Sequence, residues 1–107
     1  MKRMPLDEAY TILVSRKFNK YVKKKLPRSL KKALDRKVKF LAQNPYHTSL
    51  NTKKLKVSRR RLRDLEVDHV YEFRINMGFR CVFYVRNKTK TIILARVGNH
   101  GDVRTWF

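Results

Sequence analysis

The chain has 107 residues, enough for one domain around one core, and we assign residues 1–107 to a single domain. Its 28 Lys and Arg against 8 Asp and Glu give a net charge of +20, which favours a polyanionic partner such as RNA, DNA or an acidic protein. The lone cysteine, Cys81, excludes an intramolecular disulfide and a cysteine-rich zinc site. Its apolar neighbours predict a buried side chain rather than a reactive thiol.

The first part of the chain predicts a short strand and a helical hairpin. The strand is expected over residues 9–15, and Ser15 can cap the helix that follows. Apolar side chains recur every three or four residues in that helix at Phe18, Tyr21, Val22 and Leu26. Pro27 separates it from a second helix, which should end at Asn44 and Pro45. The apolar stripe of the second helix consists of Leu30, Leu34, Val38 and Leu41.

The remaining chain predicts a loop and then a sheet. Residues 45–57 are expected to form the loop, and strands are expected at 62–75, 79–86 and 91–97. The turns between these strands are short, so neighbouring strands should be antiparallel. The predicted fold class is therefore α+β, with two N-terminal helices packed on one face of a small antiparallel β-sheet and the other face open. No run of residues is long and apolar enough for a signal peptide or a membrane span, so a soluble cytoplasmic protein is expected.

The hairpin around residues 76–78 determines which side chains lie on the open face. A three-residue loop with Gly78 in the left-handed conformation pairs Arg74 with Arg80 and places Glu72 opposite Val82. Two arginines opposite each other repel by up to ~1 kcal/mol unless an anion lies between them. A phosphate suits two guanidinium groups well. The alternative is a Glu72–Arg80 salt bridge that neutralises the pair and has no function.

A second polar cluster follows the last strand. His100 lies between Gly98 and Gly101, on a backbone that we expect to be exposed and adaptable. An imidazole can give or take a proton near neutral pH. The alternative is a surface histidine paired with Asp102. Because the end of the last strand should lie beside the arginine face, we expect His100 to be close to Arg80.

Four segments, in this order, resemble the RelE/ParE toxin superfamily. They are LAQNPY at 41–46, KKL at 53–55, the hairpin YEFRI and GFRCVF at 71–83, and VGNHGDV at 97–103. The resemblance covers nearly the whole chain and implies a RelE-like fold and the toxin of a type II toxin–antitoxin system. The RelE-like branch of this family cleaves mRNA in the ribosomal A site, whereas ParE-like members inhibit DNA gyrase.

The RelE-like resemblance implies a ribosome-dependent endoribonuclease (an mRNA interferase) that uses neither a metal nor another cofactor. A 2′-OH of the mRNA would attack the adjacent phosphate, Arg80 and Arg74 would stabilise the negative charge, and His100 would be the general acid. The general base stays open between Glu72 and a lysine, which is Lys53, Lys54 or Lys56. Contacts to RNA are implied for Lys53, Lys56, Arg96, Trp106 and Phe107.

The implied partners are the ribosome with its mRNA and a cognate antitoxin that is acidic and partly disordered; no membrane is involved. Two other functions remain open. One is a ParE-like gyrase inhibitor without nuclease activity, and the other is a non-catalytic RNA-binding or ribosome-binding protein. His100 beside Arg80 favours the nuclease, because an inhibitor needs no acid next to a phosphate clamp.

Overall fold

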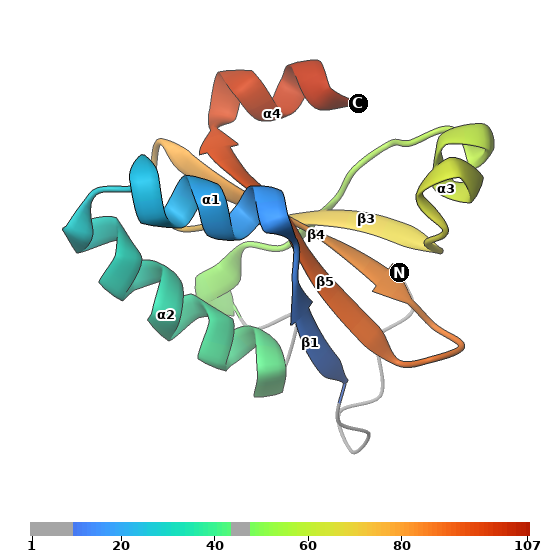
Figure 1. The fold of residues 1–107 in the computed structure, drawn as a ribbon, viewed down its shortest axis with the longest axis horizontal. Coiled ribbons are helices and arrows are strands. Elements are labelled where there is room, and N and C mark those ends of the chain that lie inside the picture. Colours follow the sequence, from blue (N-terminus) through green and yellow to red (C-terminus); the bar gives the residue numbers. More distant parts are fainter. Residues whose placement is uncertain (1–9, 44–47) are drawn as a thin grey trace.

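The strands and helices are seen in a computed structural model, which describes residues 10–43 and 48–107 (Figure 1). Along the chain they are β1 (Thr11–Val14), α1 (Arg16–Lys24), α2 (Arg28–Gln43), the 3₁₀ turn η1 (Thr48–Leu50), β2 (Lys53–Lys54), α3 (Arg59–Leu65), β3 (His69–Arg74), β4 (Phe79–Arg86), β5 (Thr91–Asn99) and α4 (His100–Trp106). The fold class is α+β, as predicted. No helix in the described ranges has the length and apolar character needed to cross a bilayer.

The sheet has five strands in the order β1-β5-β4-β3-β2. Three neighbouring pairs are antiparallel, but β1 runs parallel to β5, so the sheet is mixed rather than purely antiparallel as predicted. Parallel neighbours require a long connection between them. The whole chain from α1 to β4 provides that connection, so the pairing of β1 with β5 cannot be predicted from a local sequence pattern.

The N-terminal helices begin much as their sequence predicts. The Ser15 hydroxyl accepts a hydrogen bond from the Phe18 N–H (3.1 Å) and donates one to the Ala95 carbonyl on β5 (2.7 Å). Ser15 therefore caps α1 and also fixes its start to the sheet. Residues of α1 and α2 share one hydrophobic cluster with β3, β4 and β5, including Phe18, Leu26, Leu34, Leu41, Phe73, Cys81, Phe83 and Leu94. Ala9 and the predicted helix end at Asn44–Pro45 lie outside the described residues.

Two predictions for the middle of the chain are wrong. The segment 59–65, in part expected to be a strand, is helix α3: Ser58 accepts the Arg61 N–H (3.1 Å) and Glu66 ends the helix at φ 58°. Leu62 and Leu65 are three residues apart, a spacing that places both on one side of a helix but on opposite sides of a strand. The predicted loop at 45–57 contains β2, which pairs with β3.

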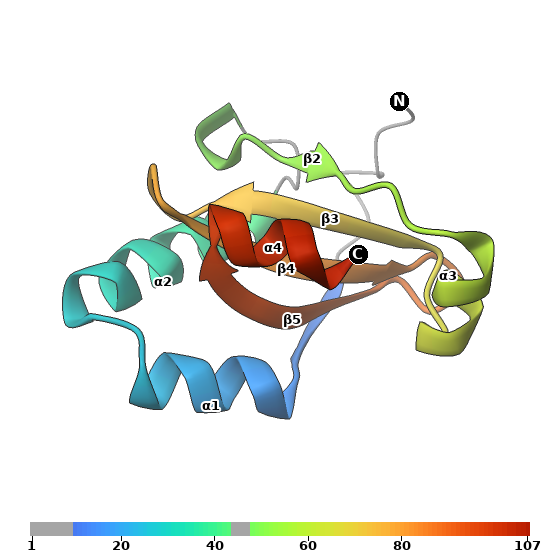
Figure 2. The ribbon, with the colours of Figure 1, turned by 90° about the horizontal axis from the view of Figure 1, so that it is seen from above.

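The second face of the sheet is not open along its whole length. A second hydrophobic cluster lies there, built on buried Val70, Val82 and Ala95. Side chains of α3 and α4 and the C-terminal Phe107 pack against it, and α4 lies beside β4 and β5 (Figure 2). The polar residues of this face are thereby limited to the part of the sheet nearest the β3–β4 turn.

Candidate functional site

The β3–β4 hairpin has the predicted register. Arg74 lies opposite Arg80, and Glu72 lies opposite Val82. The turn itself is built differently, because no glycine of the chain has a positive φ, so the prediction of a left-handed Gly78 is wrong. Instead the Asn76 side chain accepts the backbone N–H groups of Gly78 (2.9 Å) and Phe79 (2.8 Å). An asparagine side chain that satisfies the turn backbone in this way replaces the special glycine conformation.

The register continues across the sheet and places basic residues around Glu72. Lys53 of β2 lies opposite Glu72, and Arg96 of β5 lies opposite Val82 in the same row. Arg74, Arg80 and Gly98 form the adjacent row. Side chains two residues apart on a strand share a face. We call the resulting set the basic face; its members are Lys53, Glu72, Arg74, Arg80 and Arg96.

Arg80 is buried, with 7% of its surface exposed, and it is bound to the turn. Its Nη1 donates to the carbonyl oxygens of Asn76 (2.8 Å), Met77 (3.0 Å) and Phe79 (3.2 Å). Among the described residues, the Arg80 side chain has these three carbonyl oxygens as its hydrogen-bond partners and forms no ion pair with Glu72. The alternative of a Glu72–Arg80 salt bridge is therefore not what the structure contains. Nε and Nη2 carry the donors that are left for an anion.

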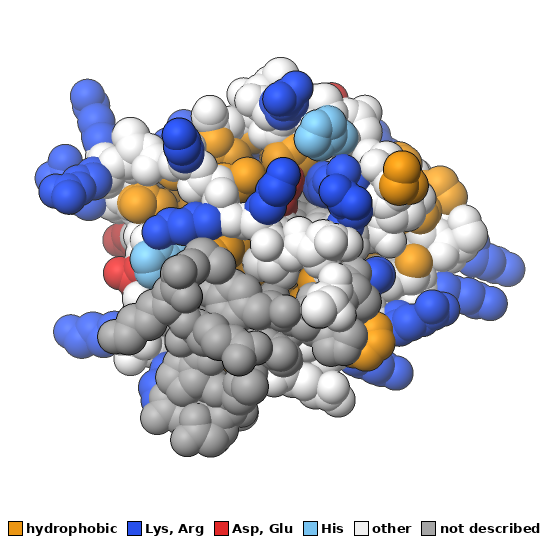
Figure 3. Space-filling model, turned by 180° about the vertical axis from the view of Figure 1, so that it is seen from behind, with side chains coloured by type: hydrophobic (Ala, Val, Ile, Leu, Met, Phe, Trp, Pro, Cys, Tyr) orange, Lys and Arg blue, Asp and Glu red, His pale blue; other side chains and the backbone are white. Residues whose placement is uncertain are grey.

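Glu72 is also buried, with 8% of its surface exposed; Lys53 lies opposite it on β2, and Arg74 lies two residues further along β3. Figure 3 shows Lys and Arg side chains on both sides of an acidic side chain, with a histidine near by. Glu72 is the carboxylate of the basic face, and the charged residues that share this face with it are cations. In the described part of the chain, no group of three or more His, Cys, Asp and Glu side chains could hold a metal ion.

His100 is the first residue of α4 and is exposed. It does not lie on an adaptable loop, as expected from its flanking glycines, because Asn99 caps the helix by accepting the Asp102 N–H (2.8 Å). The His100 N–H donates to the Gly78 carbonyl (3.0 Å). Arg80 and His100 are thus both hydrogen-bonded to the backbone of the same β3–β4 turn.

The aromatic C-terminus packs on the basic face. The Arg96 guanidinium carbon lies 3.9 Å from the centroid of the Trp106 ring, and the same ring lies against Gly98. One side of Trp106 is therefore occupied by Arg96, which limits its surface for stacking on a base. Phe107 lies near Arg61 of α3, whose guanidinium carbon is 5.9 Å from its ring centroid.

The three lysines of the β2 segment have different surroundings. Lys53 belongs to the basic face, and Lys56 lines a groove of about 320 Å³ beside Trp106 and Phe107. Lys54 lies opposite Tyr71, so the pleat turns its side chain toward the other face. There it is close enough to His69 to affect it: burial, and then the charge of Lys54, lower the pKa of the His69 imidazole.

Tyr84 also belongs to this region, although it was not identified as a site residue from the sequence. Tyr84 follows Arg80 and Val82 at alternate positions of β4 and packs on the second hydrophobic cluster. Burial raises the pKa of the Tyr84 hydroxyl, and the charges of Arg96 and Arg61 oppose that rise. The period-two spacing from Arg80 was the signal that could have identified it.

Comparisons with known proteins agree on the fold. A RelE–RelB complex from the archaeon Pyrococcus horikoshii has a TM-score of 0.69 at 17% identity, covering 88% of this chain and 98% of that one. A RelB–RelE antitoxin–toxin complex from Methanococcus jannaschii has a TM-score of 0.62 at 22% identity, covering 89% and 98%. A YoeB dimer from Staphylococcus aureus has a TM-score of 0.62 at 21% identity, covering 87% and 99%. No protein-family model and no curated protein sequence matches the chain. The chain has the fold of RelE-like toxins, which confirms at the level of the fold the resemblance seen in the sequence.

Proposed function

We propose that the chain is the toxin of a type II toxin–antitoxin system and that it cleaves mRNA on the ribosome without a metal ion. The observation that carries this proposal is the common attachment of Arg80 and His100 to the β3–β4 turn. It keeps a buried phosphate-binding group and an exposed acid–base group within one small part of the molecule. A gyrase inhibitor or a simple RNA-binding protein has no need of this combination.

In the proposed reaction, the 2′-OH of one nucleotide loses its proton to a base and its oxygen attacks the adjacent phosphorus. The bond from phosphorus to the 5′ oxygen then breaks, and His100 donates a proton to that oxygen. The products are a 2′,3′-cyclic phosphate and a free 5′-OH end. Arg80, through Nε and Nη2, and Arg74 would stabilise the extra negative charge on the phosphorane.

Glu72 is the base that the register favours. It shares the basic face with Arg74 and Arg80, whereas Lys54 has Tyr71 as its partner and belongs to the other face. Lys53, on the basic face, and Lys56, beside Trp106 and Phe107, are placed to contact RNA phosphates. Arg96 and Trp106 would take part together as a stacked pair, with Phe107 at the rim.

We propose an acidic, partly disordered antitoxin as the partner that silences the toxin. The net charge of +20 supports a polyanionic partner, and two of the similar structures are complexes of a toxin with its antitoxin. A disordered acidic segment could order itself over the basic face, since binding would supply the interactions that it lacks alone.

Primer extension on purified ribosomes loaded with a defined mRNA tests the function. We expect wild-type protein to give cuts at fixed positions, His100→Ala to reduce the cleavage rate by about 100-fold or more, and Glu72→Gln to reduce it comparably. His69→Ala is the matched control, because His69 lies across from Val85 on the other face. If His100→Ala cleaves like wild type, or wild type makes no cuts while it arrests growth, the nuclease assignment is wrong. Inhibition of gyrase supercoiling in that case would identify the ParE-like alternative.

A further inference from the structure

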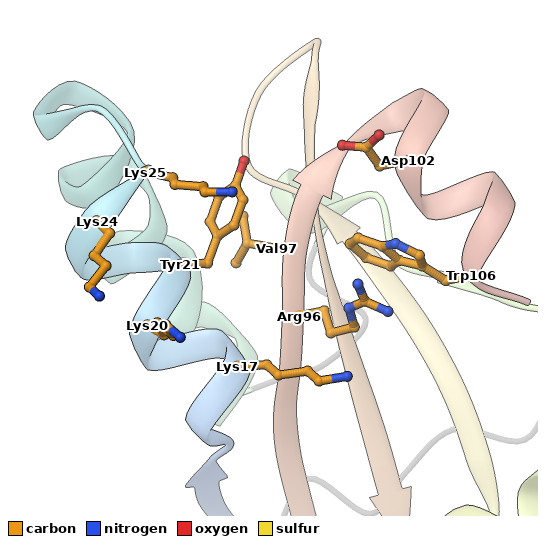
Figure 4. A pocket seen from close by; sticks show the side chains of 9 residues that line it. All are labelled: Lys17, Lys20, Tyr21, Lys24, Lys25, Arg96, Val97, Asp102 and Trp106. Atoms are coloured by element: carbon orange, nitrogen blue, oxygen red, sulfur yellow. The ribbon is translucent and has the colours of Figure 1, made fainter.

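A second basic surface lies next to the proposed site, in a groove of about 360 Å³ between α1 and α4. One wall is α1 and the other is α4, with the end of β5 as the floor (Figure 4). β1 pairs with β5 only from Thr91 to Leu94, and the groove lies along the part of β5 that continues from there to Asn99.

The charge of this groove is strongly one-sided. Its cations are Arg96 of β5, Lys17, Lys20 and Lys24 of α1, and Lys25, which caps the C-terminal end of α1. The carboxylate of Asp102 on α4 is the acidic group in its lining. Five cations against one carboxylate attract an anion with several charges. Lys17, Lys20 and Lys24 follow one another at three and four residues, so they form a row along one side of the helix.

Two aromatic rings also line the groove. Tyr21 projects from α1 between the lysines, and Trp106 faces it from α4 (Figure 4). Cationic side chains that follow a phosphate backbone, combined with aromatic rings for the bases, are the pattern of proteins that bind single-stranded nucleic acid. The volume suits a nucleotide in a single strand and is too small for a double helix.

The groove is continuous with the proposed cleavage site. Arg96 lies in the same row of the basic face as Glu72, and Trp106 belongs to the helix that begins at His100. Both residues also line the groove. An RNA strand with its scissile phosphate at Arg80 would pass over the Arg96–Trp106 pair as it reaches α1.

We propose that the groove between α1 and α4 is a subsite for single-stranded RNA, in which the lysines of α1 bind backbone phosphates and Tyr21 stacks on a base. This inference rests on the proposed function, since it names where the RNA substrate of that site continues. An acidic peptide is a poorer fit. Such a peptide would best add a strand to the free end of β5, yet Val97 is 3% exposed and Gly98 is covered by Trp106.

The test is a binding measurement that needs no ribosome and no cleavage. Trp106 is the only tryptophan, so its fluorescence reports occupancy of the groove directly. A short single-stranded RNA oligonucleotide is titrated against full-length wild type and a Lys17→Gln/Lys20→Gln variant. The matched control is Lys32→Gln/Lys39→Gln, which removes the same charge from exposed positions of α2 that do not line the groove.

We expect the α1 pair to weaken RNA binding by about tenfold and to lower the salt dependence of log K by about 1.4, as for two lost phosphate contacts. The α2 pair should change affinity by less than about threefold. Tyr21→Leu should also weaken binding by about tenfold, whereas Tyr21→Phe, which keeps the ring, should bind like wild type.

Equal losses from the two lysine pairs would overturn the proposal, because they would show attraction to overall charge alone. An effect of the α1 pair on a poly-glutamate peptide but not on RNA would also overturn it and identify an acidic peptide as the occupant. The proposed function fails separately. If wild type makes no cuts on ribosomes but the α1 lysine pair still weakens RNA binding more than the α2 pair, the RNA subsite is supported and the proposed cleavage activity is wrong. If wild type cleaves mRNA but the two lysine pairs lose equal affinity, only the subsite is refuted.

Discussion

Replacing Gly98 with alanine tests how tightly α4 is fixed to the sheet. A Cβ at this position would lie 2.7 Å from Cη2 and 2.9 Å from Cζ2 of Trp106, closer than carbon atoms can approach. The backbone itself accepts alanine, because Gly98 does not have a positive φ. The obstacle is therefore the Trp106 ring, which is also stacked on Arg96 at 3.9 Å.

Overpacking should cost about 2 kcal/mol, and the roughly 0.4–1 kcal/mol that Gly→Ala contributes by restricting the unfolded chain offsets part of it, which leaves a net loss of stability of about 1–1.5 kcal/mol. For a domain of this size such a net loss lowers Tm by roughly 5–10 °C. Circular dichroism measures the transition, and the Trp106 emission should shift to longer wavelength as the ring is displaced toward water.

Two further variants isolate the contact. Gly101→Ala is the control within α4, since its nearest atom would be Asn99 Oδ1 at 3.4 Å, and its Tm should stay the same or rise. In a Trp106→Leu background, Gly98→Ala should no longer destabilise, because the obstructing ring is gone. A Gly98→Ala protein with unchanged Tm and unchanged Trp106 emission would refute the reasoning.

Three more predictions concern single residues. Arg80→Met should destabilise the protein by about 1–3 kcal/mol in urea unfolding, because it removes the donor that binds three turn carbonyls; a variant as stable as wild type would show that the turn does not depend on Arg80. Ser15→Ala should cost about 1–2 kcal/mol, since it removes both the cap of α1 and the hydrogen bond to Ala95, and Ser15→Thr should retain most of that stability. Burial raises the pKa of the Cys81 thiol above its ordinary value of 9.0, so the folded protein should not react with Ellman's reagent at pH 8. Because the thiol ionises at lower pH in the unfolded chain than in the folded protein, the free energy of unfolding should fall as the pH rises above the unfolded pKa. Urea unfolding at pH 7 and pH 10 measures this loss, with Cys81→Ala as the control.

Features that depend on near neighbours were predictable from the sequence. The Ser15 cap, the antiparallel hairpin with Arg74 opposite Arg80, the burial of Cys81 and the α+β class all follow from spacings of a few residues. Family resemblance added the fold as a whole, because the four matching segments span most of the chain. None of these inferences required knowledge of which distant segments meet.

Other features of the fold and of the site depend on contacts between distant parts of the chain, and only the tertiary structure decided them. β1 and β5 are about eighty positions apart, so no local pattern could report their parallel pairing or the free end of β5 that forms the groove. In β2 a shift of one residue reverses the face of a side chain, which is why Lys53 rather than Lys54 lies with Glu72. The attachment of His100 to the β3–β4 turn likewise comes from a backbone contact across the sheet end. The sequence by itself determined which chemical groups this protein has, and tertiary packing decided which of them lie together, because a strand register or a groove exists only once remote segments have paired.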